Sequence, residues 1–301
     1  MATSLDPSSS SSANPCLRVV LTRPEDRQAE LVQTLQSMGC EVLQLPALTI
    51  CPLEPTEQSA HWQPERFEAI VFVSRGAWQN YRKHYWKSAG QSNQQTNPNS
   101  NNPIVACVGV ATAKEIARDL QVPLARVTYP EGDLSSDSEG LWKLLQHELK
   151  PHARVLIVRG ESGRDWLADT LASHGLQVSA LSVYRRQANA WTSEQVQALL
   201  AWSQSLQPQL SESVISSDSG VWLITSGEGL EAIAAQFGAH GLTGRPGLQP
   251  KSVVVVHQRL VEPVRRWLAN WQVGEIPVAV SAPNDETIVK ALVKALVQSR
   301  G

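Results

Sequence analysis

Several features that define common protein classes are missing from this sequence. It has only four cysteines in 301 residues, with no CxxC spacing and no nearby histidines, which argues against a disulfide framework and a zinc site. No apolar run approaches the roughly 18 residues needed to span a bilayer. Residues 1–16 are rich in serine and lack the basic and apolar regions of a secretory signal. We therefore expect a reduced, cytoplasmic protein without a metal or a membrane partner, whose residues 1–16 form a disordered tail.

The fingerprints of nucleotide and nucleic-acid binding are also missing. The loop after the apolar run 154–159 reads G-E-S-G-R, which lacks the third glycine of GxGxxG, and no GxxxxGK[ST] occurs. The net charge is −2, from 26 basic and 28 acidic residues, so no global field attracts nucleic acid. The sequence also shows no HExxH and no Ser/His/Asp arrangement. An enzyme of this composition would work by positioning and hydrogen bonding.

What the sequence does contain is a regular alternation of strand and helix patterns. A hydrophobic content of 42% fits a globular chain, and the length suggests about two domains. Several short runs are continuously apolar, as in strands of a parallel sheet covered on both faces. This pattern predicts an α/β fold with helices on both faces of parallel sheets. The predicted strands are 17–22, 40–45, 68–74, 104–109, 154–159, 176–184, 221–226, 252–257 and 277–281.

The alternation occurs twice. Residues 18–50 align without a gap on residues 154–186, with eleven identities in thirty-three positions. Arg23 falls on Arg159, and Gly39 falls on Gly175 at the expected end of a helix. Later segments repeat in the same order, so we expect two similar domains. The polar stretches 87–103 and 205–220 read as surface loops or linkers.

The loops that follow these strands are rich in small residues, hydroxyls and arginines. A loop at the carboxyl end of a parallel strand presents free N–H groups and the positive end of a helix, where anions bind. Carboxylates or phosphates suit such a site, because charge-assisted hydrogen bonds are the strong ones. The candidate ligand-binding residues are Arg23, Ser74, Gly109, Thr112, Arg159, Gly160, Ser226, Gly227 and Arg259.

Each candidate has a purely structural alternative. Either arginine could pair with a surface acid, worth roughly 0–1 kcal/mol. Thr112 and Ser226 could cap the following helices, and the glycines could serve only tight turns. His257 is better explained as a structural histidine, Asn284-Asp285 as a helix cap, and Tyr184 taken alone as an interface tyrosine.

The combined motifs resemble the uroporphyrinogen-III synthase family over about residues 17–296. The segments that carry the resemblance are VLTRP, VGVATAKEIARDL, YPEG, VRGESGRDWLADTL, SVYRR, LITSGEGL, VVVVHQRLVEP and NDETIVKAL. The R-G-x-x-G-R, TSGE and QRL forms are similar to the proteobacterial branch. The resemblance implies two α/β domains joined by a two-stranded β-ladder, with the active-site cleft between them. Domain 1 would comprise residues 17–48 and 186–301, and domain 2 the inserted residues 49–185.

The resemblance also implies an activity, that of a lyase without a cofactor. The substrate would be hydroxymethylbilane, a linear tetrapyrrole with eight carboxylates, which is closed to uroporphyrinogen III with inversion of the terminal ring and loss of water. Spontaneous closure gives the uninverted isomer, so the enzyme must control how the substrate folds. Loss of the hydroxyl would give an azafulvene-like cation and then a spiro intermediate. The expected protein is a monomer, and hand-over of substrate from hydroxymethylbilane synthase is part of this hypothesis.

Residue roles follow from the same resemblance. Tyr184 matches the tyrosine of the family's V-Y-x-R segment and becomes the catalytic candidate, a hydrogen-bond donor near the leaving hydroxyl. Thr112 matches the threonine of the G-x-x-T-A turn. The second copy of that turn departs from the pattern, because His257-Gln258-Arg259-Leu260 carries no threonine, and Arg259 is expected to take over its binding role. The alternative function is a non-catalytic two-domain binding protein for an anionic small molecule; a nucleotide-dependent enzyme is disfavoured by the missing fingerprint.

Overall fold

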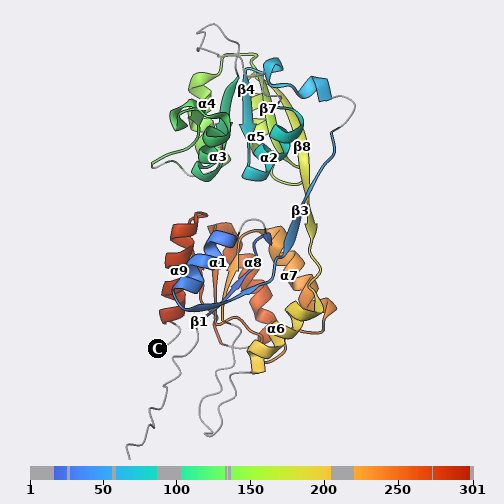
Figure 1. Ribbon diagram of the computed structural model, residues 1–301, viewed down its shortest axis with the longest axis vertical. Coiled ribbons are helices and arrows are strands. Elements are labelled where there is room, and N and C mark those ends of the chain that lie inside the picture. Colours follow the sequence, from blue (N-terminus) through green and yellow to red (C-terminus); the bar gives the residue numbers. More distant parts are fainter. Residues whose placement is uncertain are drawn as a thin grey trace, which may run out of the picture. The chain divides into compact units, whose positions relative to one another are not determined.

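The computed structural model describes residues 17–25, 28–55, 59–86, 103–132, 134, 137–204, 220–272 and 274–298 (Figure 1). The chain divides into two compact units. Unit 1 comprises Met1–Thr49 and Ala188–Gly301, and unit 2 comprises Ile50–Gln187. The predicted tail 1–16 and most of the predicted loops 87–103 and 205–220 lie outside the described residues.

Unit 1 is built on a five-stranded sheet in the order β11-β10-β9-β1-β2, with every neighbouring pair parallel. All four residues of β9 and all four of β10 are buried, as expected of strands covered on both faces. The strands are β1 (Leu17–Leu21), β2 (Cys40–Gln44), β9 (Val221–Ile224), β10 (Ser252–Val255) and β11 (Val278–Val280).

Helices cover both faces of this sheet. On one face, α1 (Ala29–Ser37) and α9 (Asp285–Gln298) pack against side chains such as Val19 and Leu223. On the other face, α6 (Ser193–Gln204), α7 (Gly227–Ala239) and α8 (Val261–Leu268) pack against Val20 and Trp222. Alternate residues of β1 and β9 therefore enter different cores, as the period of a strand requires. Short 3₁₀ segments, η5 (Gln258–Leu260) and η6 (Ala269–Trp271), flank α8.

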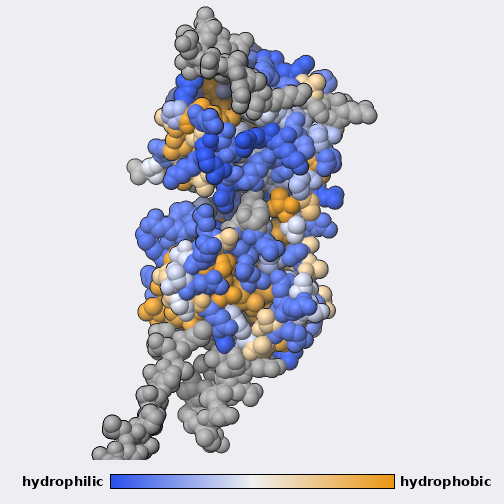
Figure 2. All heavy atoms as spheres, viewed as in Figure 1, coloured by the Kyte–Doolittle hydropathy of each residue, from blue (hydrophilic) through white to orange (hydrophobic). Residues whose placement is uncertain are grey.

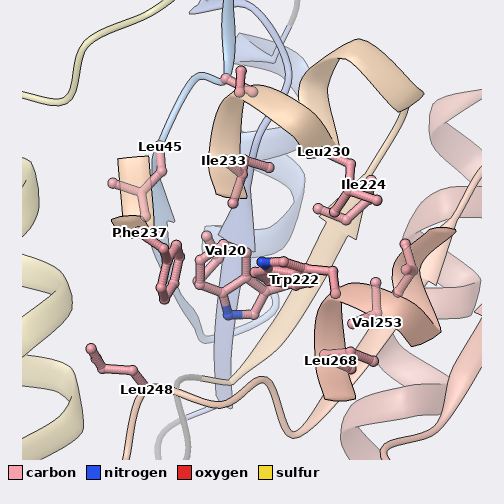
Figure 3. Close-up of a cluster of buried hydrophobic side chains, with 14 of the residues drawn as sticks. Val20, Leu45, Trp222, Ile224, Leu230, Ile233, Phe237, Leu248, Val253 and Leu268 are labelled. Carbon is pink, nitrogen blue, oxygen red and sulfur yellow. The ribbon is translucent and has the colours of Figure 1, made fainter. Parts of the chain in front are cut away.

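Aromatic side chains fill the second of these cores. Trp222, which is fully buried, lies beside Phe237, with ring centroids 5.7 Å apart (Figure 3). Phe237 also meets Trp267 and Trp271 edge to face, an arrangement that adds to the gain from burial alone. These three tryptophans therefore stabilise the fold by packing in the core.

Unit 2 has a six-stranded sheet in the order β3-β8-β7-β4-β5-β6. The pairs from β8 to β6 are parallel. Its strands are β3 (Leu48–Pro52), β4 (Ala69–Phe72), β5 (Ile104–Cys107), β6 (Val127–Thr128), β7 (Arg154–Gly160) and β8 (Gln177–Ala188). Short 3₁₀ segments lie at η2 (Ser59–Trp62), η3 (Pro64–Arg66) and η4 (Leu124–Arg126).

The sheet of unit 2 is likewise covered on both faces. The helices α2 (Arg75–His84) and α3 (Val110–Leu120) share a core with Ile70 and Phe72. The helices α4 (Ser138–Glu148) and α5 (Trp166–Ser173) pack against Ala69 and Val71. In the view of Figure 2, hydrophilic residues predominate on the outer surface of both units, as the amphipathic helices require.

The chain passes from one unit to the other in β3 and β8, which are neighbours in the sheet. The amide of Leu53 donates to the carbonyl of Val183 over 3.0 Å, and that of Asn189 donates to Ala47 over 2.9 Å. Residue numbers rise along one strand as they fall along the other, so the two strands are antiparallel. A two-stranded ladder was expected here from the family resemblance.

The predicted α/β fold with parallel sheets flanked by helices is confirmed. The repeat also has a structural counterpart: Leu35 and Leu171 are both fully buried, and both Gly39 and Gly175 have a φ near +80° after a helix, where glycine is favoured. The predicted cleft concerns the placement of the two units, and it stays a prediction.

The equivalence of Leu35 and Leu171 makes a paired stability test. We expect Leu35→Ala and Leu171→Ala each to lower the free energy of unfolding by about 2–5 kcal/mol, because each leaves a cavity in a closed core. Urea unfolding measures the loss, and hydrogen exchange followed by mass spectrometry should locate the lost protection in unit 1 for the first variant and unit 2 for the second. The exposed Gln33→Ala is the control. Losses below about 1 kcal/mol would contradict the packing described.

Candidate active site

Three loops meet at the carboxyl edge of the sheet in unit 2. The strands β7, β4 and β5 are adjacent and run in the same direction, so their last residues lie along one edge. Ser74 is the N-cap of α2, and Gly109 is the N-cap of α3. The first turns of two helices, with their unpaired N–H groups, therefore lie at this edge.

Tyr184 reaches the same edge from β8. It lies opposite Gly160 at an irregularity of the β7–β8 register, and its side chain is only 1% exposed. Its hydroxyl is 3.2 Å from Oγ of Ser74, which also accepts from the amide of Ala77 at 3.1 Å. Nη2 of Arg186 donates to the Tyr184 hydroxyl at 3.5 Å. The structure thus joins two predicted residues, Tyr184 and Ser74, in one hydrogen-bonded pair.

Gly160 is required by this tyrosine. A Cβ at position 160 would lie 2.6 Å from the ring of Tyr184, closer than real contacts allow. The structure therefore assigns Gly160 a close approach between strand and ring; its candidate role in binding stays a prediction, and the tight turn was its structural alternative.

Thr112 and Cys107 lie beside Gly109. Thr112 is buried in the first turn of α3, and its amide donates to the carbonyl of Gly109, so Gly109 rather than Thr112 is the cap. Burial raises the pKa of the Cys107 thiol to about 12, although hydrogen bonding by the Gly109 backbone opposes the shift. A thiol with this pKa stays protonated at neutral pH, so Cys107 supplies no thiolate nucleophile.

Arg159 pairs with a surface acid, which was the structural alternative for this residue in the sequence analysis. Its guanidinium pairs with the exposed carboxylate of Asp165, and its Nε donates to the carbonyl of Gly160. The loop passes close to the guanidinium at Gly163, which has a φ of +140°. The pair lies between the end of β7 and the start of α5, at the edge described for Ser74 and Gly109.

The corresponding edge of unit 1 carries the remaining candidates. Arg23, just after β1, pairs with Asp285 at 2.5 Å, the first residue of α9. Asn284 caps α9 by accepting from the amide of Thr287 at 2.9 Å, so the predicted cap is confirmed. Thr22, a buried residue that the sequence analysis did not single out, donates to the carbonyl of Leu223 and joins β1 to β9.

Ser226, Gly227 and Arg259 follow β9 and β10 on that edge. Ser226 is the N-cap of α7 and accepts from the amide of Gly229 at 3.0 Å, so it fills the predicted cap role, and Gly227 is the first residue of the helix. Nδ1 of His257 accepts from the amide of Arg259, which identifies His257 as a local structural residue. The exposed guanidinium of Arg259 has no ion-pair partner in the part of the chain that the structure describes.

The acids that neutralise the two repeat arginines could not be found from the sequence. Asp165 is six residues from Arg159, but Asp285 is 262 residues from Arg23. No sequence pattern links residues so far apart. Arg186 lies two residues after the candidate tyrosine. Because side chains alternate along a strand, residues 184 and 186 are on the same face, and this spacing was the sequence signal that could have identified Arg186.

Other kinds of site find little support. Among the described residues no cluster of His, Cys, Asp or Glu is arranged to hold a metal. The helices in the described ranges do not combine the length and apolarity that a membrane crossing requires. A polar pocket of about 380 Å³ between α2 and α3 is lined by salt-bridged residues of the later turns of both helices, such as Arg82 and Asp119, away from the strand-end edge.

Comparisons with known proteins agree with the motifs. A curated uroporphyrinogen-III synthase of Proteus mirabilis is 28% identical over 174 residues, covering 56% of this chain and 80% of that protein. A mutant uroporphyrinogen III synthase from the extremely thermophilic bacterium Thermus thermophilus matches in structure with a TM-score of 0.50 and 14% identity, covering 94% of this chain and 100% of that one. The Helicobacter pylori 26695 enzyme matches with a TM-score of 0.49 and 16% identity, covering 92% and 99%.

At 14% identity, the structural match to the Thermus thermophilus protein supports the fold alone. The family model described as "HEM4: Uroporphyrinogen-III synthase HemD" matches residues 29–273. That match extends over well more than half of the sequence and includes both units. The chain therefore belongs to the uroporphyrinogen-III synthase family.

Proposed function

We propose that this protein is a uroporphyrinogen-III synthase, a lyase that closes hydroxymethylbilane to uroporphyrinogen III with inversion of the terminal ring. The observation that carries the proposal is the family match over residues 29–273. In the reaction the C–O bond of the terminal hydroxymethyl group breaks, and the oxygen leaves as water with one added proton. Closure with inversion forms a C–C bond at the substituted α-carbon of the terminal ring, breaks the old bond from that carbon to its methylene bridge, and re-forms the bridge at the other α-carbon, whose hydrogen leaves as a proton. The reaction therefore needs no oxidant or cofactor.

The carboxylates of the substrate are proposed to bind along the two strand-end edges. The donors would be the first-turn amides of α2, α3 and α7, together with nearby guanidinium groups. Arg259 is the strongest candidate in unit 1, because it is exposed and has no ion-pair partner among the described residues. Each charge-assisted hydrogen bond contributes about 1.5–3 kcal/mol, so a few such contacts suffice to hold a polyanion.

The Tyr184–Ser74 pair is proposed to assist loss of the hydroxyl. Tyr184 is buried, whereas Ser74 is half-buried and therefore nearer to solvent. If the tyrosine donates to Oγ of Ser74, the serine proton is left to point outward. A substrate hydroxyl could then accept that proton as its C–O bond breaks. Tyr184 would act through Ser74, and Arg186 would favour this direction by donating to the tyrosine oxygen.

Three further expectations belong to the same proposal: a cytoplasmic location, a monomeric state, and hand-over of the substrate from hydroxymethylbilane synthase. Hand-over has a chemical motive, because hydroxymethylbilane closes spontaneously to the uninverted isomer. The alternative, a binding protein for an anionic small molecule, would use the same edges but would leave the isomer ratio of that spontaneous reaction unchanged.

The product isomer tests the function directly. Purified protein is incubated with hydroxymethylbilane, and the products are oxidised to porphyrins and separated by isomer. We expect type III to predominate, because the enzyme must direct closure to the inverted ring before spontaneous closure occurs. Formation of type I alone, at the rate seen without protein, would eliminate the proposal in favour of the binding protein.

Removing one hydroxyl tests the proposed pair. We expect Tyr184→Phe to lower kcat about 10- to 100-fold with little change in KM, because Ser74 loses the hydrogen bond that directs its proton toward the leaving hydroxyl while binding persists. Stopped assays at several substrate concentrations separate kcat from KM. Tyr85→Phe, another buried tyrosine of unit 2, is the matched control. Full activity in Tyr184→Phe would remove the assigned role and leave the function intact.

The charge of Arg259 is expected to affect binding. Arg259→Ala should raise KM about tenfold or more, since a lost charge-assisted hydrogen bond of about 1.5–3 kcal/mol corresponds to that change in affinity. The effect should shrink at high salt. Arg266→Ala, an exposed arginine on α8, serves as the control. An equal KM for the Arg259 and Arg266 variants would show that Arg259 does not bind the substrate.

A further inference from the structure

An exposed tryptophan lies at the edge that carries Ser74 and Gly109. The indole of Trp166 is 36% exposed, and Trp166 is the first residue of α5. It follows Asp165 directly, the partner of Arg159. Large hydrophobic side chains with this much exposure are few among the described residues, and the others are Met38, Val110, Val280 and Val297.

The internal repeat shows that the fold does not require tryptophan here. In the alignment of the two copies, Trp166 falls on Glu30, the second residue of α1. The neighbouring positions keep their burial in both copies: Leu31 and Leu167 are buried, and so are Leu35 and Leu171. A glutamate in the first turn of a helix is the ordinary choice, because it complements the helix dipole. An exposed tryptophan in its place has no comparable benefit for folding.

A second apolar side chain lies on the same edge. Val110, 38% exposed, is the first residue of α3, which covers the other face of the sheet. The strands that precede the two helices, β7 and β5, are separated only by β4. Neighbouring strands are about 4.8 Å apart, so the ends of β7 and β5 lie roughly 10 Å apart along the edge, and the two helices start on opposite faces of the sheet. An exposed apolar side chain thus lies at the start of a helix on each face of this edge.

The chemistry of the proposed substrate calls for such contacts. A linear tetrapyrrole combines carboxylates, which need N–H and guanidinium donors, with flat pyrrole rings, whose faces are apolar and rich in π electrons. An edge of amides and arginines provides donors for the carboxylates but no apolar surface for the rings. Indole rings contact other aromatic rings favourably in offset or edge-to-face geometry.

We propose that Trp166 contacts the face of a pyrrole ring of the bound tetrapyrrole, with Val110 as a flanking apolar contact. This inference rests on the proposed function and assigns a residue to binding and ring orientation. The guanidinium of Arg159, held by Asp165 next to Trp166, lies where it can meet a carboxylate carried by the same or the next ring. Trp166 would thereby help to present the terminal ring for inversion.

The test uses the full chain labelled with 5-fluorotryptophan and observed by ¹⁹F NMR. Trp166→Phe identifies the resonance of residue 166, and Trp142→Phe identifies that of the control. Trp142 lies on α4, and its ring contacts His174 at the far end of α5. Titration with uroporphyrinogen III under reducing conditions should shift the Trp166 resonance and leave that of Trp142 in place.

Kinetics with hydroxymethylbilane supply a second readout. We expect Trp166→Glu, which restores the residue of the other copy, to raise KM at least tenfold without lowering the unfolding temperature. Trp166→Phe should retain most of the parental affinity because it keeps an aromatic face. An active parent whose Trp166 resonance does not move, and whose Trp166→Glu variant keeps the parental KM, would overturn the inference alone. A parent that forms no type III isomer would overturn the proposed function and this inference with it.

Discussion

The parallel direction of the strands is the constraint on which the rest of this structure depends. Because every strand from β8 to β6 in unit 2, and every strand in unit 1, runs the same way, all strand-to-helix loops of a unit lie on one edge. Helices then begin there, with unpaired amides at their first turns. The fold thus places a row of anion-binding backbone N–H donors at this edge, whichever side chains are present. A polycarboxylate is a ligand for which such a row is suited.

The two copies of the repeat share this arrangement of strands and helices but differ in the side chains at its carboxyl edge. Both retain an arginine near the end of the first strand of the copy, yet Arg23 pairs with Asp285 and Arg159 with Asp165. The first copy has Glu30 where the second has Trp166. The two units thus have corresponding edges, and the edge in unit 2 carries the hydroxyl pair and the exposed indole.

The sequence was sufficient for the features that depend on local pattern. Continuous apolar runs such as β9 and β10 predicted buried parallel strands, and the glycines at 39 and 175 marked helix ends. What the pattern could not supply were contacts made by folding over long separations. The pairing of Arg23 with Asp285 joins the two ends of the chain, and the need for glycine at position 160 arises from a ring on a neighbouring strand. Likewise, the hydroxyl of Tyr184 meets Ser74 only because β7 pairs with both β8 and β4 and brings their ends to the same edge.

Pairing of the arginines with acids has a consequence for binding. A substrate carboxylate that approaches Arg159 or Arg23 must share or displace an aspartate, so the net gain is smaller than for a free guanidinium. In the proposed site, Arg259, which has no ion-pair partner in the described part of the chain, would give more. A site that contains both acid-paired and unpaired arginines suits an enzyme whose product carries the same eight carboxylates as its substrate. If every donor bound at full strength, substrate and product would be held equally tightly. Product release would then limit turnover without any gain in the rate of closure. Pairing keeps the arginines ordered at the edge, and under the proposed mechanism the preference for the transition state is left to Ser74 and Tyr184.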